Sequence, residues 1–196
     1  MGIDPGLSST GIGIIQEKEG AWKALFHGQA GSTPGRPLPA RLQRIHDLVA
    51  EGIETYRPDV VAVESIFFAR NVRSAVLMAH GRGAAVLAAA RLGIEVVEYS
   101  PLEIKQSVVG KGRASKEQVC QMVTTLLGLA APPATDHESD ALACALCHAF
   151  RSCSMQARRR HIAASLPADE ESREFVERKE LLAMSFKRGG RRRGRR

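Results

Sequence analysis

Acidic residues stand at three places in the chain where a metal-dependent hydrolase would need them. The first is Asp4, which follows Ile3 and precedes Pro5-Gly6. An apolar strand residue followed by an acid and an immediate turn leaves the carboxylate at a rigid edge that a cation can approach. Alone, the motif is equally typical of a turn aspartate that satisfies its own backbone hydrogen bonds. The motif indicates a metal site only if further acidic residues accompany it.

The second acid is Glu64, directly after the apolar run Val60-Val61-Ala62-Val63. Such a run predicts a buried parallel strand. A charge at the end of a buried strand loses hydration unless it is paired or bound to a metal. Pairing with Arg70 or Arg73 is the structural alternative to a metal.

The third acidic group is Asp136-His137-Glu138-Ser139-Asp140, at the start of the last predicted core helix. His137 and Asp140 are three residues apart, and Asp136 and Asp140 are four apart, so either pair can share a helix face. Acids in a first helical turn also serve as ordinary dipole partners. Combined with the two strand-end carboxylates, however, the group could hold two divalent ions that activate a water and stabilise the leaving oxygen of a phosphodiester. Asp136 and Glu138 stay open as alternatives to His137.

Basic residues gather in two regions of the chain. Lys105 and Lys116 flank the loop Gly110-Lys111-Gly112-Arg113, a flexible cationic segment suited to neutralising a nucleic-acid backbone, although a solvated surface loop would look the same. Residues 1–150 carry 14 Lys/Arg against 15 Asp/Glu, and residues 151–196 carry 14 against 6. The chain's net charge of +7 therefore belongs to the C-terminal segment, which should attract polyanions.

The elements that must position these residues are predicted from apolar periodicity and turn signals. We expect a hairpin built on strands at 12–15 and 24–26, further strands at 60–63 and 95–99, and a strand that ends at Asp4. We expect helices at 38–57, 74–92, 101–104, 115–127 and 136–150. Strands that form a hairpin first and then alternate with helices predict a mixed α/β sheet with helices on its faces.

Four motifs resemble the RuvC family of Holliday-junction resolvases, in that family's order and spacing. They are GIDPG, VAVESIFF, IKQSVVGKGRASKEQV and DHESDALACAL, and the resemblance covers residues 1–151. It implies a ribonuclease H-like α/β fold with a mixed five-stranded sheet and helices on both faces. It also implies an endonuclease that resolves Holliday junctions by paired, symmetric nicks in opposing strands, in homologous recombination and DNA repair.

The resemblance also implies the residues of the site and the partners. Two Mg²⁺ ions per subunit would be held by the catalytic set Asp4, Glu64, His137 and Asp140. Phe67 would stack on an unpaired base at the junction centre, and the DNA would be contacted by Lys105, Lys111, Arg113 and Lys116. The family implies a homodimer built around the helix at 74–92, with four-way junction DNA and the RuvA–RuvB branch-migration complex as partners.

One departure from the family pattern concerns His137, because many members have an acid at that position. A neutral imidazole lowers the negative charge of the site and favours metals that accept nitrogen ligands. We therefore predict that Mn²⁺ supports cleavage at least as well as Mg²⁺.

The expected organisation is a nuclease domain at 1–151 and a basic, largely disordered extension at 152–196, in which 169–186 could form a helix. No apolar run is long enough for a membrane span and no signal peptide is evident, which predicts a cytoplasmic protein.

Three other functions share part of this pattern. A sugar-kinase-like phosphotransferase also begins with strand–Asp–x–Gly, but it needs two such halves and an adenosine site. A non-catalytic junction-binding relative would have lost metal ligands. Here all four positions of the implied catalytic set carry side chains that can bind a metal. A ribonuclease H-like nuclease could also act on another branched or hybrid substrate. Only the family resemblance favours a resolvase over this function.

Overall fold

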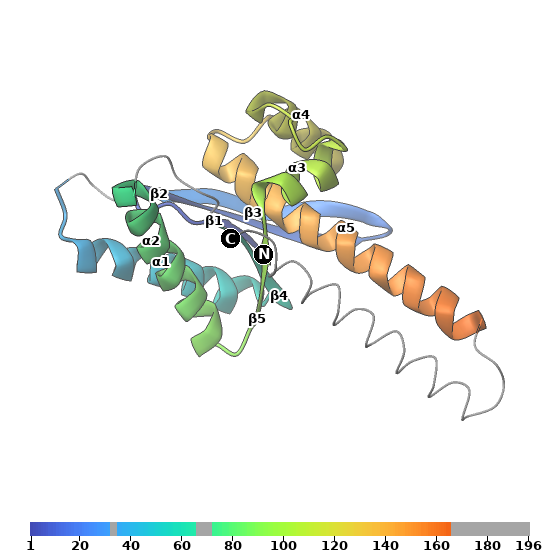
Figure 1. Ribbon diagram of the computed structural model, residues 1–196, viewed down its shortest axis with the longest axis horizontal. Helices are drawn as coiled ribbons and strands as arrows, with labels where there is room; N and C mark the ends of the chain where they lie inside the picture. Colours follow the sequence, from blue (N-terminus) through green and yellow to red (C-terminus); the bar gives the residue numbers. More distant parts are fainter. Residues whose placement is uncertain (32–34, 66–71, 166–196) are drawn as a thin grey trace, which may run out of the picture. The chain divides into compact units, whose positions relative to one another are not determined.

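The structure is a computed structural model that describes residues 1–31, 35–65 and 72–165 (Figure 1). The chain divides into two units, Met1–Arg151 and Ser152–Arg196. Phe67 and the predicted helix at 169–186 lie outside the described residues. The elements are β1 (Gly2–Asp4), β2 (Ser9–Lys18), β3 (Ala21–Gly31), α1 (Leu38–Tyr56), β4 (Val60–Glu64), α2 (Val72–Arg91), β5 (Glu95–Tyr99), α3 (Pro101–Val109), α4 (Lys116–Leu127) and α5 (Asp136–Ser165).

The first unit is built on a five-stranded mixed sheet in the order β3-β2-β1-β4-β5. β2 pairs antiparallel with both β1 and β3, whereas β4 runs parallel to β1 and to β5. The shortest strand, β1, therefore lies at the centre between the hairpin and the parallel pair. The predicted α/β class and the mixed five-stranded sheet are confirmed.

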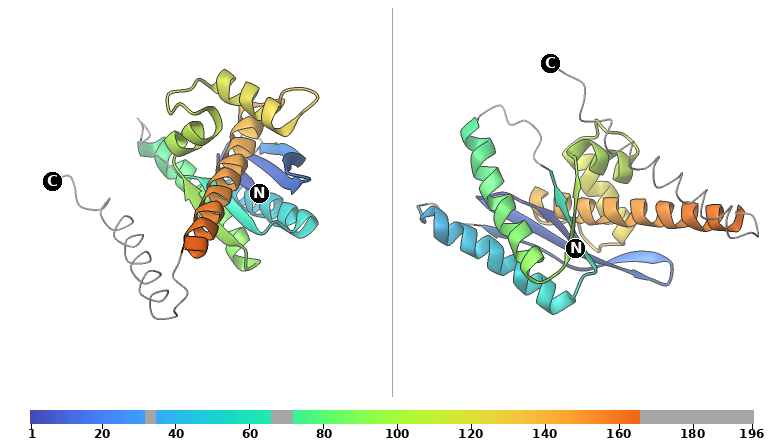
Figure 2. Two further views of the ribbon diagram at one scale, coloured as in Figure 1. Left: turned by 90° about the vertical axis from the view of Figure 1, so that its right-hand side faces the viewer. Right: turned by 60° about the horizontal axis from the view of Figure 1, so that its bottom comes forward.

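Helices cover both faces of the sheet, as Figures 1 and 2 show. On one face, Ile3 and Val63 pack with Ile45 and Val49 of α1 and with Ala85 of α2. On the opposite face, the core of α3, α4 and α5 packs against the sheet at a position that includes the buried Ala62. Because successive side chains of a strand point to opposite faces, the residues that flank Ile3 and Val63 face α5.

The hairpin is longer than predicted. β2 and β3 extend over ten and eleven residues and meet at Glu19-Gly20, where φ is 56° and 80°. Positive φ at both turn residues is the geometry of a tight two-residue hairpin turn. The sequence prediction stopped at the apolar centre of each strand, but backbone pairing continues through the exposed polar residues at its end.

Two helices also exceed their predicted length. α3 begins at a capping box formed by Ser100 and Glu103 and continues to Val109, where Gly110 adopts a left-handed conformation and ends it. α5 runs to Ser165 instead of ending at Phe150. No glycine or proline follows Phe150 before that point. In the described part of the chain, no helix has the length and apolar character that crossing a bilayer requires.

Candidate active site

Two of the four predicted ligands end neighbouring parallel strands. Asp4 is the last residue of β1 and Glu64 the last residue of β4, and the register pairs Ile3 with Val63. Since Ile3 and Val63 belong to the core under α1 and α2, the next residue of each strand faces α5. Strand alternation and register thus bring both carboxylates to one edge of the sheet on one face.

The turn after Asp4 is closed by tight backbone packing. Thr10 is fully buried, and its hydroxyl donates a hydrogen bond to the Gly6 carbonyl oxygen at 2.7 Å. A Cβ atom at Gly6 would lie 2.2 Å from the Ser9 carbonyl oxygen, so only glycine fits there. The residues Asp4-Pro5-Gly6 and Thr10 therefore act together to hold the chain immediately beyond the carboxylate.

Three glycines of the sheet form a seat for the start of α5. Gly2 of β1 is the cross-strand partner of Gly13 of β2, and Gly11 pairs with Asp4. Added Cβ atoms at Gly11 and Gly2 would lie 1.9 Å from the His137 carbonyl oxygen and 2.1 Å from the Ala141 carbonyl oxygen.

The absence of side chains at this seat lets α5 lie with its main chain directly against β1 and β2. This role was not predicted from the sequence. The alternation of Gly11 and Gly13 on one strand face, opposite a helix with Ala141 and Ala145 one turn apart, is the signal that could have found it.

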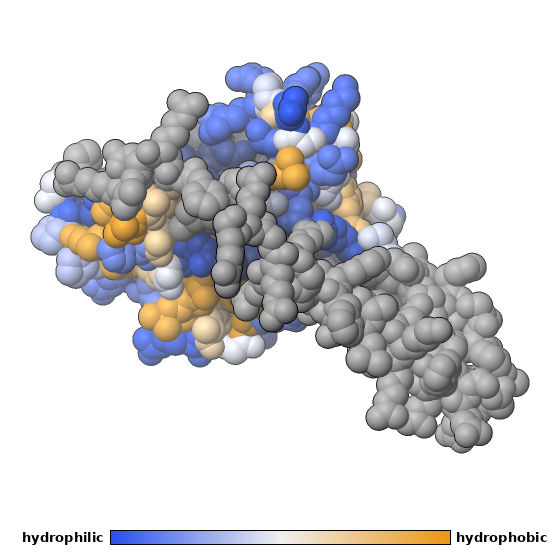
Figure 3. Space-filling model, viewed as in Figure 1, coloured by the Kyte–Doolittle hydropathy of each residue, from blue (hydrophilic) through white to orange (hydrophobic). Residues whose placement is uncertain are grey.

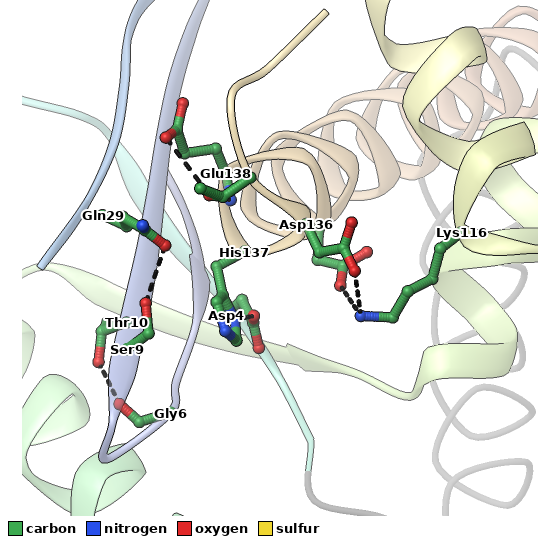
Figure 4. A network of polar contacts seen from close by, with 11 residues as sticks. Asp4, Gly6, Ser9, Thr10, Gln29, Lys116, Asp136, His137 and Glu138 are labelled. Atoms are coloured by element: carbon green, nitrogen blue, oxygen red, sulfur yellow. Dashed lines mark hydrogen bonds and ion pairs between the residues drawn. The ribbon is translucent and has the colours of Figure 1, made fainter. Parts of the chain in front are cut away.

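The glycine seat places His137 against Asp4. The His137 Nδ1 atom lies 2.6 Å from the Asp4 Oδ2 atom, and Figure 4 shows the two side chains facing each other. This hydrogen bond is the main reason why the pKa of His137 is raised above its usual value. With Nδ1 engaged by Asp4, Nε2 is the ring nitrogen that stays available for another partner.

Glu64 and Asp140 complete a group of mutually repelling carboxylates. Burial, followed by the charges of Asp4 and Asp140, raises the pKa of Glu64 from 4.5 to about 7. Burial and the Asp4 charge also raise the pKa of Asp140. Burial and mutual repulsion disfavour the ionised form of these carboxyl groups. A bound cation would stabilise that form.

The ammonium group of Lys116, at the start of α4, lies beside these carboxylates. Its Nζ atom lies 3.1 Å from Asp136 Oδ2 and 3.6 Å from Asp140 Oδ2. Figure 4 shows Lys116 reaching across to the first turn of α5. The family resemblance implies a DNA contact for Lys116, but this pairing was not predicted from the sequence.

Asp136 and Glu138 differ from His137 in where they point. Glu138 is buried and its Oε2 atom lies 2.6 Å from Nδ1 of His27 on β3, while Thr135 caps the same turn and donates to Glu138 Oε1. Asp136 is exposed and pairs with Lys116. His137 is therefore the member of this turn that reaches Asp4. His27, which the sequence analysis did not single out, anchors the start of α5 to the hairpin.

The predicted basic residues have different environments. Lys105 donates a hydrogen bond from Nζ to the Ala114 carbonyl oxygen at 2.7 Å, and its charge lowers the pKa of Glu64. It therefore braces the loop that leads into α4, beside the acidic group. Lys111 and Arg113 lie in that loop and are exposed.

The donor set fits a divalent metal in chemistry, since carboxylates and an imidazole are its common protein ligands. Over the described ranges, however, no group of three His, Cys, Asp or Glu side chains is already gathered closely enough to hold an ion. Asp4 and His137 contact each other, and Lys116 contacts Asp140, so both contacts must adjust when an ion enters.

Comparison with known proteins gives a family match over most of the chain. The family model described as crossover junction endodeoxyribonuclease RuvC matches residues 1–148. The chain is 45% identical to the RuvC of Rubrobacter xylanophilus over 150 residues, which cover 76% of this chain and 84% of that protein. It is 48% identical to the RuvC of Geotalea uraniireducens over 152 residues, covering 78% and 88%.

Solved structures agree with the sequence comparison. The structure of Thermus thermophilus RuvC superposes with a TM-score of 0.72 at 38% identity, covering 78% of this chain and 94% of that one. The same protein in complex with Holliday junction substrate gives 0.73 at 39% identity, covering 77% and 92%. The yeast mitochondrial Holliday junction resolvase Ydc2, at 14% identity and a TM-score of 0.57, shares the fold.

Proposed function

The chain belongs to the RuvC family of crossover junction endodeoxyribonucleases, and on that basis we propose that it resolves Holliday junctions at a site formed by Asp4, Glu64, His137 and Asp140. Family enzymes are divalent-metal-dependent nucleases. The products are paired, symmetric nicks in opposing strands, made during homologous recombination and repair in the cytoplasm. One observation carries this proposal: side chains from β1, β4 and α5 converge at one sheet edge, with Asp4 and His137 2.6 Å apart.

The four side chains would hold two Mg²⁺ ions, and Mn²⁺ would also serve. When bound, such ions supply Lewis-acid activation of a water and neutralisation of the leaving oxygen of the phosphodiester. The protein's own contribution is to fix its ligands in place. Strand ends hold Asp4 and Glu64, the glycine seat holds the turn with His137 and Asp140, and His27 locks that turn through Glu138.

The surroundings of the site suit a DNA backbone. The ammonium group of Lys116 lies at its edge, and the exposed Lys111 and Arg113 lie in the loop between α3 and α4. Cationic side chains that flank a hydrolytic site position a phosphate without reading sequence. Phe67, which lies outside the described residues, is proposed to stack on an unpaired base at the junction centre.

A homodimer is proposed through α2, because a four-way junction has two-fold symmetry and requires two sites. Four large apolar side chains of α2 are exposed in the single chain, namely Val76, Leu77, Met78 and Leu87. Figure 3 shows apolar residues among the polar ones on the side that carries α1 and α2. The RuvA–RuvB branch-migration complex is the proposed protein partner.

Cleavage of a labelled four-way junction, beside linear duplex and an RNA–DNA hybrid, tests the proposed activity in Mg²⁺ and in Mn²⁺. We expect paired nicks in the junction only. Asp4→Asn should bind the junction and leave it uncut. Preferential cutting of the hybrid would point to another substrate, and cutting by Asp4→Asn would overturn the proposed ligand set.

A further inference from the structure

Lys116 contacts two acids that stand one helical turn apart. Asp136 and Asp140 are four residues apart in α5, and the Lys116 ammonium reaches both, at 3.1 and 3.6 Å. The two acids differ in environment. The Asp136 side chain is 65% exposed, whereas Asp140 is 27% exposed and belongs to the carboxylate group with Asp4 and Glu64. One ammonium therefore joins a proposed metal ligand to an acid outside the proposed ligand set.

The position of Lys116 is fixed from the α4 side as well. Ser115 caps α4 and forms a capping box with Gln118, so that Lys116 is the first helical residue. Lys105 braces the preceding loop through the Ala114 carbonyl oxygen. The backbone of Lys116 is thus held in place. Only the rotatable bonds of its side chain, which reaches Asp136 and Asp140, can still change.

The Lys116 charge acts on the acidic group. It lowers the pKa of both Glu64 and Asp140, opposing the raising effect of burial and of the neighbouring acids. A positive charge that favours ionised carboxylates does in the metal-free protein what a divalent ion does in the loaded one. Both cations cannot stay against Asp140 without repelling each other.

We propose that Lys116 is the resident counter-cation of the metal-free site, and that Asp136 is a positioning residue that retains the ammonium when a metal ion takes the Asp140 carboxylate. The proposal rests on the proposed metal site. Because Asp136 is the nearer of the two partners, the ammonium gives up the longer contact and keeps the shorter one. It then stays at the edge of the site instead of moving into solvent or competing for Asp140.

The two roles predict opposite changes in metal affinity. In Lys116→Met, the competing cation is gone, and Mn²⁺ should bind about tenfold more tightly. In Asp136→Asn, the ammonium keeps Asp140 as its remaining partner, and Mn²⁺ should bind about three- to fivefold more weakly. Both changes are measured by calorimetric titration of MnCl₂ into the full chain without DNA, at about pH 8 so that Glu64 is ionised.

The control for the loss of a negative charge is Glu117→Gln, which removes the charge next to Lys116, keeps a side-chain oxygen that can accept the Ser115 hydrogen bond, and leaves Asp136 in place. We expect a smaller loss of affinity in this variant than in Asp136→Asn. Equal losses would overturn the role of Asp136, and unchanged affinity in Lys116→Met would overturn the counter-cation. Lys116→Gln gives the same test with a polar side chain if the Met variant folds poorly. Failure of the wild-type chain to bind Mn²⁺ would instead overturn the metal site itself.

Discussion

At the scale of single residues, the ionised form of Glu64 is strongly disfavoured in the folded, metal-free protein. Its pKa of about 7, raised by burial and by Asp4 and Asp140, compares with 4.5 in an unfolded chain. Between these two values the folded, metal-free protein binds a proton at Glu64 that the unfolded chain has released. Since the folded state holds the extra proton, the free energy of unfolding falls as pH rises through this window.

Glu64→Gln should remove that dependence, because an amide carries no charge at any pH. Relative to the wild type, the variant should gain on the order of 1–3 kcal/mol above about pH 7 and nothing below about pH 4.5. Urea unfolding in EDTA at both ends of the window measures the difference. Glu95→Gln, an exposed acid that begins β5, should keep the wild-type pH dependence. Identical slopes for wild type and Glu64→Gln would contradict the assignment.

His137 sets the charge and the ligand type of the site. Replacing it by Asp adds a carboxylate next to Asp4 and removes the only proposed nitrogen ligand. We expect His137→Asp to shift the ratio of cleavage rates towards Mg²⁺ relative to Mn²⁺, because imidazole suits the transition metal better than Mg²⁺. Junction cleavage in each metal measures the ratio, and equal ratios in wild type and variant would refute this role.

Individual site residues were predictable where a local rule constrains them. Asp4 and Glu64 end predicted strands, and helical spacing puts His137 and Asp140 on one face. Local spacing alone did not show which side chain of this turn contacts Asp4, because that depends on which side of α5 meets β3, where His27 pairs with Glu138. The contact between Lys116 and Asp136 joins residues 20 positions apart in the sequence, so no local spacing pattern predicts it.

At the scale of elements, the decisive contact is the one between α5 and the strands beneath it. Helix–sheet separation is usually set by side chains, but here Gly2, Gly11 and Gly13 let the α5 main chain touch the sheet. Helix position and ligand position are thus coupled, because His137 contributes both the carbonyl above Gly11 and the ring beside Asp4.

Gly11→Ala should therefore damage stability and activity together. The new Cβ atom would lie 1.9 Å from the His137 carbonyl oxygen, which forces the first turn of α5 away. We expect a loss of about 1–3 kcal/mol in unfolding free energy and a fall in the cleavage rate of about a hundredfold. Gly31→Ala, on the exposed end of β3, has its nearest atom at 3.8 Å and should change neither. A fully active Gly11→Ala would show that α5 does not need its glycine seat.

Element boundaries followed the strength of the local signal. The strands at 60–63 and 95–99 and the helix capped by Ser115 were predicted almost to the residue, because apolar runs and caps mark them. The length of the hairpin was underestimated because β2 and β3 stay paired through exposed polar residues beyond their apolar centres. The end of α5 was missed because after Phe150 the apolar periodicity stops but no helix breaker follows.

At the scale of the whole molecule, charge and chemistry are separated along the chain. The residues of the site all precede Arg151, in a region with 14 Lys/Arg and 15 Asp/Glu up to residue 150. The remaining 46 residues carry the positive excess, 14 Lys/Arg against 6 Asp/Glu. Junction preference and general DNA affinity should therefore have different sources.

Deleting residues 152–196 should weaken DNA binding and flatten its salt dependence, because fewer counterions are released from the DNA. Preference for a junction over linear duplex should be retained. Fluorescence anisotropy over a series of salt concentrations measures both quantities for each DNA. Unchanged affinity at low salt would show that this segment is not a DNA-binding arm.

The glycine seat also decides which parts of the protein can be altered by engineering. Main-chain contact sets the distance between α5 and the sheet, so this distance does not change when neighbouring side chains change size. The core beneath α1, with Ile45, Val49 and Ile53, lies on the other face of the sheet and can be redesigned for heat resistance with the carboxylates left in place. The face beneath α5 has no such tolerance, so its glycines mark where redesign must stop.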